Sequence, residues 1–174
     1  MKAELQLSSA WAEYDTLAQQ VQANRMVVGA ARQVVLVSVK VLEALDSYIG
    51  AVRRGDDAGC YGDKAPEWRF TLGRLNRQRA EFAAEHRGLV HRAYLEAAFA
   101  CVVVTKRETL ALAVRPSPEE FSSIVRAKCS EQAEAMNAAA NNIEGLTPEQ
   151  RAEANRLFDL AVSRAVNEYR SATK

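Results

Sequence analysis

Two of the three cysteines are spaced so that a disulfide could join two helices. Cys101 lies fourteen residues before Arg115, Cys129 lies fourteen residues after it, and a Pro-Ser-Pro sequence follows Arg115. If the chain doubles back there as two antiparallel helices, both cysteines stand roughly 20 Å from the turn, because a helix rises 1.5 Å per residue. Neighbouring alanines would allow the close approach, with Cα atoms about 5.5 Å apart, that a disulfide requires.

The sequence leaves two states of this pair open. A disulfide would place the protein in an oxidising compartment. Without it, the pair would be two buried thiols, which behave as small apolar side chains. The third cysteine, Cys60, lies in the loop sequence GDDAGCYGD, where an exposed thiol would either link two chains or remain free.

The two histidines do not form a metal-binding pair. His86 and His91 are five residues apart, which on a helix places them about 140° from each other around the axis. Glu81 and Glu85 form an acidic pair at helical spacing that could bind a cation or exchange a proton. Arginines flank this pair on both sides, so a solvated charged face is the simpler interpretation.

No motif for catalysis or for a cofactor is found. The chain has no Cys-x-x-Cys motif, phosphate-binding glycine loop or Gly-x-Ser-x-Gly turn. Asp56, Asp57 and Asp63 could ligate calcium, but they do not have the spacing of an EF-hand. We therefore predict that the protein is not an enzyme and has no catalytic residue, cofactor or metal.

A basic face is predicted near the start of the second long helical segment. Arg69, Arg74 and Arg77 share a broad face of a helix, and Arg79 falls outside it. The whole chain has 23 basic and 22 acidic residues, so no overall field attracts nucleic acid or an anionic membrane. Solvated arginines are the simplest interpretation, an acidic partner protein comes next, and nucleic acid is the weakest candidate.

The elements that position these residues are predicted to be helices in one domain over 1–174. Breakers cluster in a glycine-aspartate loop at 55–65 and in two proline turns. The predicted segments are 1–54, with a break near 24–29, then 66–115, 118–143 and 148–172. Ser117 and Thr147, each followed by proline and by Glu120 or Gln150 at the third helical position, predict two capping boxes.

We predict an all-α fold, an antiparallel bundle of four to six helices of which two are long. The sequence VVLVSVKVL, residues 34–42, also fits a strand with alternating sides. A helix is favoured, because no turn signal follows and a lone pair of strands is marginally stable.

The segment from Met26 to Val52 has only four charged residues, so a helix there is apolar nearly all round. Such a helix should be central, either covered by its own chain or packed against another copy. The residues that we predict for such an interface are Trp11, Tyr14, Val34, Val41, Leu45 and Ile49.

The predicted function is a non-catalytic interaction, assembly or structural protein that self-associates through this segment. The alternative is an exported sensor-like bundle that holds a small apolar ligand among Trp11, Phe82, Tyr94, Phe99 and Met136.

No membrane span is predicted. The expected location is the cytoplasm or a particle if Met1 is the native start, and the periplasm or exterior if a leader has been removed. Abundant alanine and arginine indicate a bacterial or phage protein.

Overall fold

The computed structural model describes residues 2–23, 29–143 and 145–173, and within them the chain is all α-helical, with no strand. Five α-helices and two short 3-10 helices follow one another in the order α1 (Lys2–Ala23), α2 (Ala30–Asp57), η1 (Gly62–Lys64), α3 (Ala65–Leu110), α4 (Pro118–Ala139), η2 (Asn141–Ile143) and α5 (Pro148–Ala172). The predicted helical bundle is therefore confirmed, and the strand alternative for residues 34–42 is wrong.

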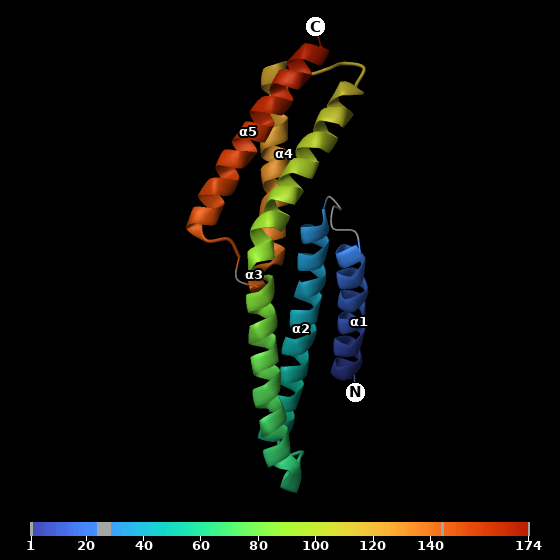
Figure 1. Ribbon diagram of the computed structural model, residues 1–174, viewed down its shortest axis with the longest axis vertical. Coiled ribbons are helices and arrows are strands. Elements are labelled where there is room, and N and C mark those ends of the chain that lie inside the picture. Colours follow the sequence, from blue (N-terminus) through green and yellow to red (C-terminus); the bar gives the residue numbers. More distant parts are fainter. Residues whose placement is uncertain (1, 24–28, 144, 174) are drawn as a thin grey trace.

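Helix α3 is the common support of the molecule. It is 46 residues long, and its two halves have different neighbours. Figure 1 shows α2 beside its first half, with α1 on the outer side of α2, and α4 and α5 beside its second half. The result is an elongated arrangement in which one helix belongs to two three-helix groups.

Each group has its own hydrophobic core. The first core joins α1, α2 and the first half of α3, and Met136, Ala140 and Ile143 from the end of α4 and from η2 close it. The second core joins the second half of α3 to α4 and α5. There the rings of Phe121 and Tyr169 stack with centroids 4.2 Å apart, and the Tyr169 hydroxyl donates to the carbonyl oxygen of Pro116.

Helix α2 is central because its own chain covers it. Val41 and Leu45 are fully buried, and Val34 and Ile49 are buried almost as completely. These four residues, predicted to form an interface between copies, are therefore core residues in this structure. Burial by α1, by α3 and by the segment around Ile143 explains why residues 30–52 of α2 carry only four charges.

The two predicted capping boxes are confirmed. The Ser117 hydroxyl accepts from the Glu120 amide, and the Glu120 carboxylate accepts from the Ser117 amide at 2.8 Å. Thr147 and Gln150 make the same reciprocal pair at the start of α5. The hydrogen bonds from Ser117 lower the pKa of Glu120.

Other boundaries differ from the predicted ones. Helix α2 continues through Gly55 to Asp57. The ring of Tyr61 lies against Gly55, and a Cβ at this position would be 2.4 Å from the Tyr61 hydroxyl oxygen. The loop at 55–65 is thus much shorter than predicted. Helix α3 ends at Leu110 rather than 115, and α4 ends at Ala139, followed by η2.

The predicted break near 24–29 lies mostly outside the described residues. Gly29, which is described, is the N-cap of α2 and has a φ of 89°, a conformation that favours glycine.

Candidate functional site

An open groove runs between α1 and α2 in the first helical group. Its volume is about 920 Å³, and the residues that line it are Ser9, Ala12, Glu13, Thr16, Leu17, Gln33, Leu36, Val37 and Lys40. Helix α1 contributes mainly small side chains, whereas α2 contributes Leu36, which is 40% exposed. We call these residues the α1/α2 groove.

The α1/α2 groove carries one ion pair on its rim. Lys40 of α2 donates to the Glu13 carboxylate of α1 at 2.7 Å, and both side chains remain about half exposed. A smaller hollow of about 360 Å³ continues along the same two helices past this pair, and Glu43 and Ser47 border it. The exposed face of the two helices is therefore apolar at its centre and has both signs of charge at its edge.

The opposite face of α1 is held by aromatic side chains. Trp11 and Tyr14 lie edge-on to Phe82 of α3, with ring centroids 5.0 and 5.1 Å from it. Both residues were predicted to belong to an interface between copies. In the structure they attach α1 to α3, and the face of α1 that remains exposed bears its small residues instead.

Buried His86 completes this aromatic cluster. Its Nδ1 atom lies 2.8 Å from the carbonyl oxygen of Phe82, and its Nε2 atom lies 2.8 Å from the Tyr14 hydroxyl. A carbonyl oxygen can only accept, so Nδ1 carries the proton, and in the neutral ring Nε2 accepts from the hydroxyl. Burial is the main cause of the raised pKa of Tyr14, and the nearby negative charges of Glu85 and Asp15 raise it further.

Both nitrogens of His86 thus have structural partners. Within the described residues, no group of three or more His, Cys, Asp and Glu side chains is placed to hold a metal ion. Asp56, one of the three loop aspartates, pairs with Arg69 at 2.8 Å. Glu81 and Glu85, the acidic pair of the sequence, are exposed on α3.

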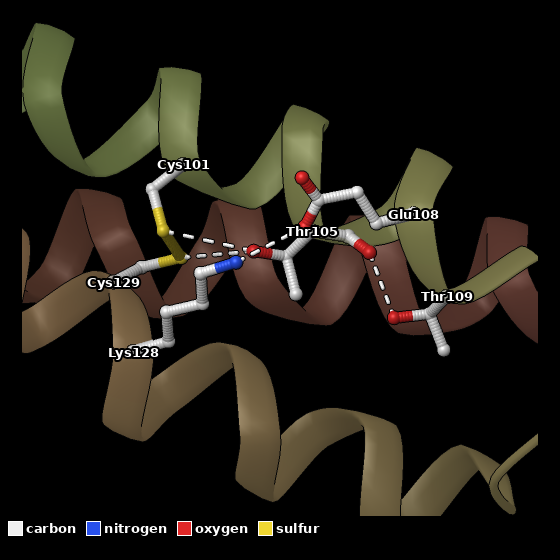
Figure 2. The surroundings of a disulfide bond; sticks show 6 residues. All are labelled: Cys101, Thr105, Glu108, Thr109, Lys128 and Cys129. Carbon is white, nitrogen blue, oxygen red and sulfur yellow. Dashed lines mark hydrogen bonds and ion pairs between the residues drawn. A yellow bond between two sulfur atoms is a disulfide. The ribbon is translucent and has the colours of Figure 1, made fainter.

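Cys101 and Cys129 form a disulfide between α3 and α4, with their Cα atoms 5.4 Å apart. Figure 2 shows the two sulfurs beside the Thr105 hydroxyl, which lies 3.7 and 3.9 Å from them. On the outer side, Lys128 pairs with Glu108 at 3.1 Å (Figure 2). The symmetric spacing around the proline turn was therefore a correct guide, and the pair is not two free thiols. Cys60 is exposed and unbridged.

The predicted basic face is exposed. Arg69, Arg74 and Arg77 all lie on the outside of α3. The hydrogen bond from Arg69 to Asp56 is the main reason why the pKa of Arg69 is raised. Arg79 points away from this face, because it makes two hydrogen bonds to Asp46 of α2.

The five residues proposed to hold an apolar ligand do not gather round one cavity. Trp11, Phe82 and Met136 pack in or against the first core, and Tyr94 packs in the second. Phe99 is on the surface, 37% exposed. The structure therefore does not bring these five residues together, because they are divided between two cores and the surface.

The α1/α2 groove was not predicted, although the sequence holds a signal for it. Gln33, Lys40, Glu43 and Ser47 follow one stripe of α2 at spacings of three, four and seven residues. Leu36 is the apolar residue in this polar stripe. A single apolar residue on a solvated face is common, so this signal alone does not predict a contact surface.

Comparisons with known proteins identify no relative: no family model, no curated protein and no solved structure matches this chain. One segment of the described chain, Gly62–Leu110, contains a window that is long and apolar enough to cross a membrane. Core helices of soluble proteins pass the same test, and 44% of that window is buried inside the molecule.

Proposed function

We propose that the protein is a non-catalytic interaction protein that pairs with a second copy of itself through the α1/α2 groove. The observation that carries the proposal is that one exposed groove is lined both by an exposed apolar side chain, Leu36, and by the small residues Ser9, Ala12 and Thr16. An interface with two-fold symmetry needs complementary features of this kind on the same patch.

The geometry of two paired helices supports a second copy as the occupant. Leu36 of each copy would enter the groove of the other, and α1 and α2 of both copies would form a four-helix bundle. The 22 residues of α1 span about 33 Å, and two helices are about 20 Å wide. The resulting face of roughly 650 Å² approaches the roughly 800 Å² per partner of a standard interface, so we expect a moderate, concentration-dependent dimer.

The rim charges fit the same arrangement. Glu13 and Lys40 have opposite signs and lie next to each other on the face. In a dimer with two-fold symmetry, Glu13 of one copy can pair with Lys40 of the other, and Lys40 of the first copy with Glu13 of the second. Dimerisation then leaves neither charge unpaired. Lys40 can also reach Glu43 of the second copy on the adjoining hollow.

The residues most suited to chemistry support a non-catalytic role. His86 is buried with both ring nitrogens in hydrogen bonds, and Cys101 is bonded to Cys129. The disulfide also supports work in an oxidising compartment, since thiols in the cytosol are usually kept reduced.

Sedimentation equilibrium tests the dimer, using chains that all carry Cys60→Ser so that no covalent dimer forms. We expect the parent chain to dimerise below about 1 mM, and Leu36→Lys to weaken dimerisation at least tenfold. Ile124→Lys is the matched control, because Ile124 on α4 is 44% exposed and lies outside the groove.

Ala12→Leu tests the small residues of the groove separately from Leu36. Ala12 is exposed, so the folded monomer should tolerate the larger side chain, and dimerisation should weaken because the groove is filled. A parent chain that stays monomeric at 1 mM, or a Leu36→Lys variant that dimerises like the parent, would contradict the proposal.

A further inference from the structure

A second exposed apolar surface lies on the other helical group, between α3 and α5. Its exposed apolar residues are Phe99, Val103 and Leu160, which are 37%, 63% and 59% exposed. A groove of about 270 Å³ lies between the two helices and is lined by Phe99, Val102, Val103, Lys106, Ala161, Arg164, Ala165 and Glu168. We call this surface, with Leu160, the α3/α5 surface.

Cations surround the α3/α5 surface. Lys106 and Arg164 line the groove itself, and Arg164 is 83% exposed. Arg107 lies one helical turn after Val103, and Arg156 lies one turn before Leu160; both are exposed.

Two acids near the surface already have partners. Glu168 pairs with both Lys106 and Arg164, and these hydrogen bonds lower its pKa. Asp159, next to Leu160 in the chain, pairs with Arg126 of α4. Glu153 is also exposed, one helical turn before Arg156. Four cations against Glu168 and Glu153 leave two positive charges around an apolar centre, so the surface as a whole favours a negatively charged partner.

The disulfide fixes the helix that carries half of this surface. Cys101 lies between Phe99 and Val103 in the sequence, two residues from each, and therefore projects from the opposite side of α3. Its bond to Cys129 fastens the back of α3 to α4, while the front remains exposed. A surface held rigid in this way loses little conformational freedom when a partner binds.

We propose that the α3/α5 surface binds an acidic amphipathic helix of a partner protein. Apolar side chains of that helix, three or four residues apart, would lie against Phe99, Val103 and Leu160. Aspartate or glutamate residues on its flanks would pair with Arg164 and with the neighbouring arginines. The inference goes beyond the proposed function, because this surface belongs to the second helical group and the α1/α2 groove belongs to the first.

The first step of the test is selection of a phage-displayed library of random 16-residue peptides on the immobilised full chain. We expect enriched peptides to have two apolar residues three or four positions apart, flanked by Asp or Glu. The most enriched peptide is then synthesised, and its dissociation constant is measured by fluorescence polarisation against the parent chain and against variants.

Val103→Glu and Arg164→Glu should each weaken peptide binding at least tenfold, and binding to the parent chain should fall as salt increases. Ile124→Glu is the matched control and should bind like the parent. Leu36→Lys should also bind like the parent, which separates this surface from the dimer. Circular dichroism melts of all variants confirm that they are folded, as expected for exposed positions.

Three results would overturn the inference: no enrichment of acidic peptides, an enriched peptide that binds both glutamate variants as tightly as the parent, or binding that does not depend on salt. Vesicles containing phosphatidylglycerol are the comparison. If the chain binds them, if Val103→Glu abolishes this binding and if no peptide is enriched, the surface recognises an anionic membrane and the proposed protein partner is wrong.

Discussion

His86 shows how a single polar residue can be accommodated in an apolar core. Its ring is 3% exposed and is surrounded by aromatic side chains, yet each nitrogen has one hydrogen-bond partner. One partner is the carbonyl oxygen of Phe82 on the same helix, and the other is the Tyr14 hydroxyl on α1. The contact between Tyr14 and His86 is therefore the polar link that attaches α1 to α3.

Replacing Tyr14 with phenylalanine tests this link. Tyr14→Phe keeps the ring but leaves the Nε2 atom of His86 buried without a partner, which should lower the free energy of unfolding by about 1 to 3 kcal/mol. Urea denaturation measures the change. Tyr48→Phe is the control, because the described chain shows no hydrogen bond from the Tyr48 hydroxyl. Equal losses for the two variants would mean that the hydrogen bond to His86 contributes nothing specific.

At the scale of elements, the starts of α4 and α5 are determined by residues close together in the chain. In each capping box a hydroxyl and a side chain three residues later satisfy amide groups that a helix leaves free. The α4 box uses a carboxylate, Glu120, and the α5 box uses an amide, Gln150. Of the two reciprocal side chains, only Glu120 can lose a charge in acid; at the start of α5 the charge is on the neighbouring Glu149, whose pKa is lowered by hydrogen bonds to its own backbone and to Thr147.

Glu120→Gln tests this difference between the boxes. The folded-state pKa of Glu120 is lowered from 4.5, so its stabilising effect is present above 4.5 and is lost as pH falls through the folded value. We expect Glu120→Gln to be less stable than the parent at pH 7, and the difference to shrink towards pH 3. Thermal melts across this range measure it.

The control for this pH effect lies on the same helix. Glu131 is exposed on α4, and the described chain shows no hydrogen bond to its side chain. Glu131→Gln should follow the parent at every pH. A stability difference for Glu120→Gln that stays constant from pH 7 to pH 3 would exclude a role for the charge of Glu120.

The sequence predicts such local features well and tertiary ones poorly. The capping boxes depend on spacing alone and were predicted, and the symmetric spacing of Cys101 and Cys129 showed that a disulfide was possible but left two buried thiols as the alternative. The stretch after Leu110 depends on a distant residue, because the Tyr169 hydroxyl donates to the Pro116 carbonyl in the loop that follows α3. The role of Gly55 depends on how the next turn folds back, because the Tyr61 ring lies against it. No pattern in one helix reveals which distant side chain will lie against it.

At the scale of the whole molecule, the separation into two cores was also hidden from the sequence. The pattern of α3 is that of one long helix, with no break where its neighbours change. Only the contacts show that α2, with α1 on its outer side, packs on the first half and that α4 and α5 pack on the second half. A consequence is that the disulfide belongs to the second core alone.

Removing the disulfide should therefore act mainly on one half. For Cys101→Ala with Cys129→Ala we expect a loss of about 3 to 4 kcal/mol, from the entropy of closing a loop with a sequence separation of 28 residues. Hydrogen exchange should show the loss in α4, in α5 and in the second half of α3, with little change in α2. The Cys60→Ser chain is the control, since it keeps the disulfide.

Reductant gives a second control for the same prediction. It should reproduce the loss in the Cys60→Ser chain and have no effect on the chain without Cys101 and Cys129. A loss of protection spread evenly over all five helices would mean that the two cores unfold as one unit.

The uninterrupted course of α3 has a consequence for binding to more than one partner. At 1.5 Å per residue its 46 residues span about 70 Å. The α1/α2 groove lies level with the middle of α3, where Tyr14 contacts His86, and the α3/α5 surface lies nearer its end, at Phe99 and Val103. In the proposed dimer the rigid helix would hold the two copies of the α3/α5 surface at a fixed distance from each other. A ligand with two acidic segments and a linker of matching length would gain avidity from that spacing, whereas a ligand with a shorter linker would bind through one site only.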